Sequence, residues 1–288
     1  MNRRQFIHTS TAVVGSSLTC ANSRASEPYG IWDSHNHLGR NNETPAKHAG
    51  DLIRIGGRFG ITKFTIAMGL TPHLRDPKPA EFRAKNDHMM AALDAYPDQT
   101  VGLVFINPLY LRESLAEIDR CMRHPLVIGL KLWIACRCND PRLDPIVERA
   151  NKHHATIHQH VWDRHQPKPE GESYPEDLAE LGLRHPQTQF VAMHSGGTWV
   201  RGLRALRRAP NVSAEISGSE PVSGFVDMAV RELGDRRVIW GSDAPGRSFA
   251  SQLAKVYEAD LSEQARRNIL RDNYRNQVMR ALAHKKAR

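Results

Sequence analysis

Short apolar runs alternate with longer amphipathic or polar segments along most of the chain, and this alternation constrains the fold more than any other feature. The apolar runs are hydrophobic on both faces, as in parallel strands that helices cover on both sides. The predicted strands span Ile31–His37, Lys63–Met68, Val101–Asn107, Val127–Trp133, Thr156–Val161, Gln189–His194, Val212–Ile216 and Arg237–Gly241. The predicted helices between them include Pro79–Tyr96, Leu111–Arg123, Asp144–His153, Pro175–His185 and Gly224–Gly234.

Eight strands that alternate with helices over ~250 residues predict an α/β chain folded as a (β/α)8 barrel, the TIM barrel. A doubly wound open sheet is the alternative, but no Gly-rich phosphate loop follows the first predicted strand. We find no linker, repeat or low-complexity tract, so residues 26–288 are predicted to form a single barrel domain. Residues 262–286 are predicted to add extra C-terminal helices to it.

Residues 1–25 have the three parts of a bacterial export signal. Arg3 and Arg4 precede a short, mildly apolar run around Val13, and small residues follow from Ala21 to Ala25. The arginine pair resembles a twin-arginine signal, whose pathway exports proteins that are already folded. We therefore expect the twin-arginine machinery to deliver the protein to the periplasm, with a disordered basic tail as the alternative. No later run approaches the ~18 apolar residues of a membrane span, so none is expected.

The formal net charge of +9 raises the question of a nucleic-acid partner. Three of the basic residues, Arg3, Arg4 and Arg24, lie in the first 25 residues, which contain no acidic residue. The other basic residues are scattered among acidic ones, with no interleaved stripe of aromatic residues. This pattern argues against nucleic-acid binding.

The first predicted strand carries Asp33, His35 and His37 at alternate positions. Residues two apart on a strand share a face, so all three side chains are expected to point the same way. Three ionisable groups on one strand face are costly to bury unless something binds them. Neutral imidazole is the commonest protein metal ligand, so a divalent metal is the natural candidate. The alternative is a polar loop, or histidines satisfied by ordinary hydrogen bonds.

Polar residues also stand at the carboxyl ends of four other predicted strands. The carboxyl-end regions of the fourth, fifth and sixth strands carry Lys131, His160 and His194, and Asp243 follows the eighth. Each comes after an apolar run and precedes Gly, Ser or another turn former. Because the chemistry of a barrel sits at the carboxyl ends of its strands, these residues are expected to meet the histidine pair of the first strand.

An H-x-H pair, a lysine, two histidines and an aspartate on successive strands together resemble the amidohydrolase superfamily. The sequence Gly-Ser-Asp-Ala-Pro at 241–245 and the ending Asn-Tyr-Arg-Asn at 273–276 are similar to its amidohydrolase-related branch of metal-dependent TIM-barrel hydrolases and decarboxylases. The resemblance runs from about residue 31 to the terminal helices. It implies a barrel that binds one or two divalent metals, usually zinc or manganese.

The resemblance implies that His35, His37, His160 and Asp243 hold one metal ion per chain, taken here as Zn²⁺ with Mn²⁺ as the alternative. A bound metal lowers the pKa of its water toward ~7. Asp243 would touch both metal and water, which suits it to act as a general base. His194 is expected to polarise the substrate and shuttle a proton, with a role as a further ligand as the alternative.

Three further residues are assigned supporting roles. Asp33, deeper on the first strand, is expected to orient a histidine ligand, unless it is only a polar residue at a strand start. Lys131 is expected to face the substrate as a cation, whereas in binuclear relatives the corresponding lysine is carboxylated and bridges two metals. Arg247 is expected to grip a substrate carboxylate with its planar guanidinium, and the alternative is a surface arginine.

The sequence thus predicts a metal-dependent hydrolase that uses a metal-activated water on a C–O or C–N bond of a lactone, ester or amide. Non-oxidative decarboxylation of an unsaturated or aromatic acid is the alternative, because the same ligand set serves both reactions. A barrel that binds a small molecule without catalysis is a third possibility, which the retention of every expected ligand disfavours. The sequence is compatible with an oligomer. Substrate specificity in a barrel depends on its loops, and the loop sequences indicate no particular substrate.

Overall fold

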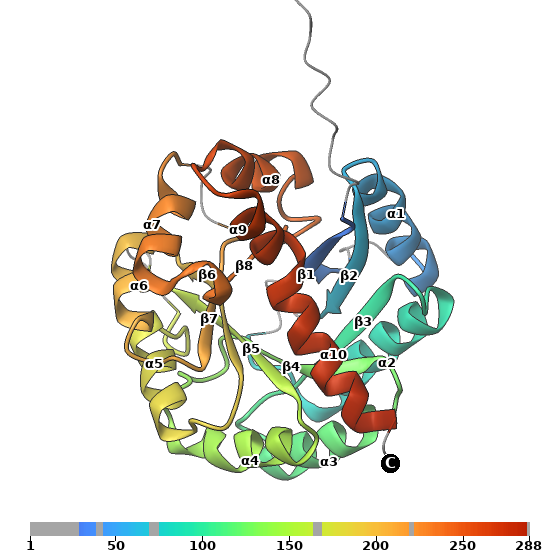
Figure 1. Cartoon of the computed structure of the whole chain (residues 1–288). Coiled ribbons are helices and arrows are strands. Elements are labelled where there is room, and N and C mark those ends of the chain that lie inside the picture. The colour runs from blue at the N-terminus through green and yellow to red at the C-terminus, as the bar shows by residue number, and fades with distance from the viewer. Residues whose placement is uncertain (1–28, 39–42, 69–74, 164–168, 219–221, 287–288) are drawn as a thin grey trace, which may run out of the picture.

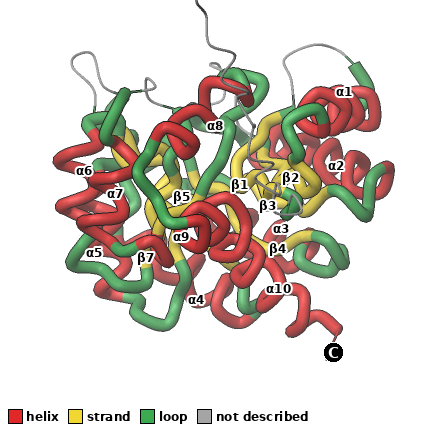
Figure 2. Tube along the Cα trace, turned by 45° about the horizontal axis from the view of Figure 1, so that its top comes forward, coloured by secondary structure: helices red, strands yellow, loops and turns green. Residues whose placement is uncertain are grey.

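Eight parallel strands form one sheet whose order follows the sequence, and helices surround it (Figures 1 and 2). The computed structural model describes residues 29–38, 43–68, 75–163, 169–218 and 222–286. The strands are β1 (Ile31–His37), β2 (Ile61–Ala67), β3 (Thr100–Phe105), β4 (Val127–Leu132), β5 (Thr156–Trp162), β6 (Phe190–Gly196), β7 (Val212–Glu215) and β8 (Val238–Ile239). The predicted (β/α)8 barrel is confirmed.

The ring closes between β1 and the segment that follows β8. The N–H of Asp243 donates to the carbonyl of His35 (2.8 Å), and the N–H of His37 donates to the carbonyl of Ala244 (2.7 Å). The predicted eighth strand, Arg237–Gly241, is therefore longer than the observed one, because most of the closure uses irregular chain after β8.

Each β-strand is followed by a helix that packs outside the barrel. These helices are α1 (Pro45–Gly57), α2 (Pro79–Ala95), α3 (Leu111–Cys121), α4 (Asp144–Lys152), α5 (Pro175–Arg184), α6 (Trp199–Leu206), α7 (Phe225–Leu233) and α8 (Phe249–Glu258). The predicted helices are all present, with ends that differ by no more than two residues. Helices α2 and α5 begin at prolines, whose fixed φ suits a first helical position.

The extra C-terminal helices are also present: α9 (Glu263–Arg267), the π-helical segment η3 (Asn268–Asp272) and α10 (Asn273–Lys286). Helix α10, red in Figure 1, crosses the amino-terminal end of the barrel. Its Tyr274 and Val278 pack in one apolar cluster with Val101, Ile128 and Val191 from the barrel interior. Burial of an apolar side chain contributes ~1.5–3 kcal/mol. These contacts therefore hold α10 firmly over this end of the barrel and close it.

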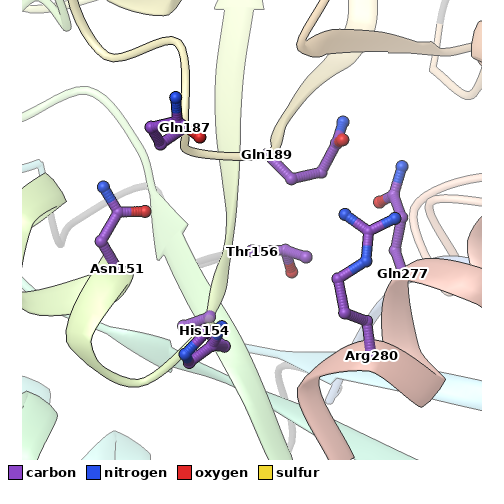
Figure 3. A pocket seen from close by; sticks show the side chains of 8 residues that line it. Asn151, His154, Thr156, Gln187, Gln189, Gln277 and Arg280 are labelled. Carbon is purple, nitrogen blue, oxygen red and sulfur yellow. The ribbon is translucent and has the colours of Figure 1, made fainter. Parts of the chain in front are cut away.

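A cavity of about 350 Å³ lies at the same amino-terminal end, beside α10 (Figure 3). Its lining contains no acidic residue and consists of Asn151, His154, Ala155, Thr156, Gln187, Gln189, Gln277 and Arg280. Because the chemistry of a barrel sits at the carboxyl ends of the strands, this cavity is on the wrong side to be the reaction site.

The proposed export signal, residues 1–25, lies outside the described residues. Among the residues that the structure describes, no helix has the length and apolar character that crossing a membrane requires.

Candidate metal centre

The histidine pair of β1 meets Asp243 at the carboxyl end of the barrel. The Nε2 atoms of His35 and His37 lie 2.9 Å apart. The Oδ1 atom of Asp243 lies 3.7 Å from Nε2 of His35 and 3.5 Å from Nε2 of His37. All three side chains are buried, so two imidazole nitrogens and a carboxylate oxygen converge in a protected site.

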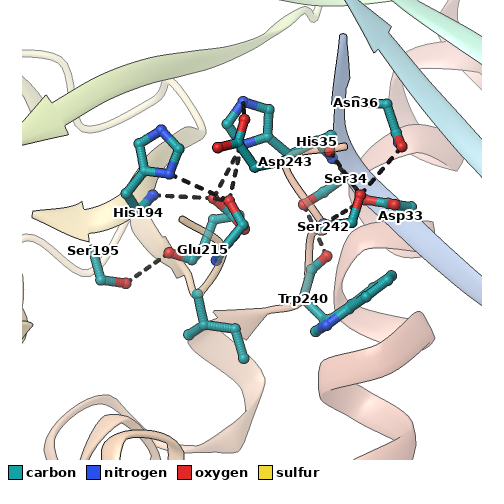
Figure 4. Close-up of polar contacts among 12 residues, drawn as sticks. Asp33, Ser34, His35, Asn36, His194, Ser195, Glu215, Trp240, Ser242 and Asp243 are labelled. Atoms are coloured by element: carbon teal, nitrogen blue, oxygen red, sulfur yellow. Dashed lines mark hydrogen bonds and ion pairs between the residues drawn. The ribbon is translucent and has the colours of Figure 1, made fainter. Parts of the chain in front are cut away.

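His194 reaches the same site from the end of β6 (Figure 4). His35, His194 and Asp243 can each present one ligand atom so that all three atoms lie within 4.8 Å of one another. This placement suits both roles considered for His194, a proton shuttle beside the metal and a further ligand. Its assignment stays a prediction.

His160 lies beside these groups but has another partner. Its ring centroid is 5.0 Å from that of His194, and its Nε2 is 2.9 Å from Oε1 of Glu172. For His160 to bind the same ion as His35 through Nε2, that nitrogen would have to exchange the Glu172 carboxylate for the metal. Glu172 is fully buried and is not among the residues predicted from the sequence.

The protonation states of these residues fit a divalent metal. Burial, followed by the charge of Lys131, holds the pKa values of His35 and His37 well below the usual range, so both imidazoles are neutral near pH 7. Neutral imidazole is the form that binds a metal. Burial raises the pKa of Asp243 to about 6, which still leaves it mostly ionised at pH 7. Two neutral imidazoles and one carboxylate are a donor set that zinc and similar ions accept.

The two predicted substrate cations differ in their surroundings. Lys131 on β4 is buried, with its Nζ 3.4 Å from Nε2 of His35, and burial lowers its pKa to about 8. It therefore stands directly against the proposed ligands. Arg247 is exposed in the loop after β8, where its Nη1 donates to the carbonyl of Gly246 (3.1 Å). Contact of either residue with a substrate stays a prediction.

Asp33 supports the site through the main chain. Its Oδ1 accepts the N–H of His35 (3.1 Å) and the N–H of Ser242 (2.9 Å). It thus connects β1 to the segment that carries Asp243, whereas the role predicted from the sequence is to orient a histidine side chain. Burial raises the pKa of Asp33 to about 7.

The carboxylate beside the His35 ring is Glu215, at the end of β7. Its Oε2 lies 3.4 Å from Nδ1 of His35, and the residue is fully buried. The sequence did contain a signal for it, because an acidic residue inside the apolar run Val212–Ile216 follows the same strand-end rule as His160 and Asp243. No residue of this strand is among the predicted site residues.

Two glycines make room for the site. A Cβ on Gly218 would lie 2.3 Å from Nδ1 of His194, and the φ of +80° there is itself unfavourable for other residues. A Cβ on Gly241 would lie 2.6 Å from Oε1 of Glu215. The packing around His194 and Glu215 therefore requires glycine at both positions.

Comparison with known proteins identifies the family. The sequence model described as amidohydrolase matches residues 32–275. The chain belongs to the amidohydrolase family. The resemblance noted in the sequence is thereby confirmed. A comparison with curated proteins finds no match.

Several solved structures of decarboxylases are similar in fold. A 2,6-dihydroxybenzoate decarboxylase in complex with 2,6-dihydroxybenzoate aligns with a TM-score of 0.68 at 13% identity, over 87% of this amidohydrolase and 98% of that chain. A dihydroxybenzoic acid decarboxylase from Polaromonas, with bound manganese and the inhibitor 2-nitroresorcinol, gives a TM-score of 0.69 at 13% identity over 87% and 97%. The 5-carboxyvanillate decarboxylase of Sphingomonas paucimobilis gives 0.65 at 16% over 80% and 82%. At these identities the likeness establishes the fold alone.

Proposed function

We propose that this amidohydrolase is a metal-dependent, non-oxidative decarboxylase of an aromatic or otherwise unsaturated acid. The observation that carries the proposal is its likeness to dihydroxybenzoate decarboxylases over nearly their whole length. The hydrolase expected from the sequence uses the same ligands, but these comparisons support decarboxylation better than hydrolysis of a C–O or C–N bond. Family membership also supports an enzyme over a barrel that only binds a ligand.

The chain carries side chains that suit the steps of this reaction. Loss of CO2 from a carboxylate breaks one C–C bond, leaves its electron pair on the ring carbon, and requires one proton at that carbon. Lys131 and Arg247 are the cations proposed to hold the substrate carboxylate. His194 and Asp243 are the groups proposed to move the proton, because both lie at the buried centre where their pKa values are shifted.

The proposed cofactor is one divalent ion per chain, held by His35, His37, His160 and Asp243. Zinc is proposed from the imidazole-rich donor set, and manganese is the alternative because a similar decarboxylase structure contains it. When bound, such an ion would hold substrate oxygens and stabilise negative charge that develops during the reaction.

Release of CO2 tests the proposed reaction. Protein loaded with Zn²⁺ or Mn²⁺ is incubated with hydroxybenzoic acids and, separately, with lactones, esters and amides. We expect one CO2 per acid consumed, measured by a coupled carbonate assay, and no turnover of the other compounds. Asp243→Asn, loaded in the same way, is the inactive control. Hydrolysis of a lactone, ester or amide without any CO2 from the acids would refute the decarboxylase and restore the hydrolase.

We also propose that residues 1–25 export the folded protein to the periplasm through the twin-arginine pathway. Replacement of both Arg3 and Arg4 by lysine is expected to leave the protein in the cytoplasm, because the pathway recognises the arginine pair. Fractionation of cells followed by immunoblotting measures this. Arg24→Lys, outside the pair, should export normally. Unchanged export of the double variant would show that the arginine pair is not a signal.

A further inference from the structure

A buried carboxylate and a serine stand directly behind the proposed metal ligands. Glu215 ends β7 and is fully buried, and Ser217 follows two residues later. We propose that Glu215, acting through Ser217, is the positioning residue that makes both His35 and His194 present Nε2 to the metal centre. The inference rests on the proposed metal-dependent function and adds a residue for which the sequence analysis had no role.

Hydrogen-bond directions around Ser217 support this assignment. The Ser217 hydroxyl donates to Oε2 of Glu215 (2.9 Å). The hydroxyl oxygen is then left as an acceptor. Nδ1 of His35 lies 3.0 Å from this oxygen, and Nδ1 of His194 lies 3.3 Å from it. Both imidazoles therefore carry their proton on Nδ1.

The tautomer decides what each histidine offers to the centre. A neutral imidazole with its proton on Nδ1 has a lone pair on Nε2. For His35 that lone pair faces the site, since its Nε2 lies beside His37 and Asp243. Carboxylates that fix metal-binding histidines in this way raise the basicity of the ligand as well as orienting it. The direct 3.4 Å approach of Glu215 to Nδ1 of His35 adds to the bond through Ser217.

The same glutamate also holds the backbone that carries His194 (Figure 4). Its Oε2 accepts the N–H of His194 (3.0 Å), and its main-chain carbonyl accepts the hydroxyl of Ser195 (2.7 Å). His194 and Ser195 have φ of 67° and 49°, a left-handed conformation that non-glycine residues adopt only where their surroundings hold it. Glu215 thus places one proposed ligand from β1 and one catalytic candidate from β6.

Substitution Glu215→Gln tests this with little change of shape. The glutamine keeps one acceptor oxygen but loses the charge. Its NH2 group can only donate, although the neighbouring His194 N–H and Ser217 hydroxyl are donors as well. We expect Zn²⁺ binding, measured by competition with a chromophoric chelator, to weaken by ~10–100-fold. The visible absorption of the Co²⁺-loaded protein should change as well. Ser217→Ala, which removes the link to both Nδ1 atoms and keeps the carboxylate, should weaken Zn²⁺ binding in the same direction.

Glu117→Gln is the matched control, since Glu117 is a buried glutamate of α3 that bonds Asn86 and Arg120, away from the centre. It should alter the melting temperature of the metal-free protein without altering Zn²⁺ affinity or the Co²⁺ spectrum. If wild type binds metal and both Glu215→Gln and Ser217→Ala bind it equally well with an unchanged spectrum, the positioning role is overturned. If Glu215→Gln does not fold, Ser217→Ala decides alone. Wild-type protein that binds no metal would overturn the proposed function and this inference together.

Discussion

Replacement of His35 and His37 together by alanine is expected to abolish bound metal and activity at the same time. The two Nε2 atoms lie 2.9 Å apart beside Asp243, so the double variant removes two of the three converging donors. The loss should exceed the ~10–100-fold that removal of an outer partner of a ligand causes. Metal content by elemental analysis should fall from near one ion per chain to background, and turnover should fall with it.

His158→Ala is the control for the loss of an interior histidine. His158 is fully buried on β5, its ring lies edge-on to Tyr274 at 5.7 Å, and neither ring nitrogen has a partner among the described residues. This variant should lose stability but keep its metal. Full activity of wild type after exhaustive chelation, with metal verified as absent, would contradict the proposed role of the pair.

Replacement of His194 by asparagine is expected to lower kcat by ~10²–10⁴-fold, the range that a positioned acid or base contributes. If His194 moves a proton beside the metal, the variant keeps its metal, because His35, His37 and Asp243 remain. Elemental analysis and steady-state kinetics on the same preparation separate these effects. A kcat close to that of wild type would exclude the catalytic role. Metal lost together with activity would instead identify His194 as a ligand. Its position permits this, because one ligand atom each of His35, His194 and Asp243 lie within 4.8 Å of one another.

Much of the fold could be predicted from sequence because strands and helices here have strong local signals. The apolar run Ile31–His37 coincides with β1, and the terminal helices begin at Glu263, one residue after the predicted start. The eighth strand was overestimated because Val238-Ile239-Trp240 is apolar throughout, whereas only part of it pairs with β7. A run of hydrophobic residues indicates that the segment is buried, but a buried residue need not form the backbone hydrogen bonds of a β-sheet.

The candidate site was predictable where a polar residue ends an apolar run, as for His194 and Asp243. Glu172 lay beyond this rule, because it meets His160 through a loop between β5 and α5. For Asp33 the strand face was foreseen, but its bonds to main-chain N–H groups were not. Such bonds depend on how β1 packs against the chain after β8. This long-range contact cannot be predicted from the pattern of residues within either segment.

The closure of the ring between β1 and the chain after β8 has a consequence for assembly. His35 and Ser242 are 207 residues apart in sequence, and a hydrogen bond of 3.3 Å joins them across this seam. Three of the four proposed ligands, His35, His37 and Asp243, lie on β1 or in the segment after β8, so an ion that they share would connect the first strand to the chain that follows the last one. A ligand that binds only the closed form favours it by mass action, by ~2.7 kcal/mol at a hundredfold excess over its Kd. Under the proposed metal site, binding of the ion therefore stabilises the closed barrel.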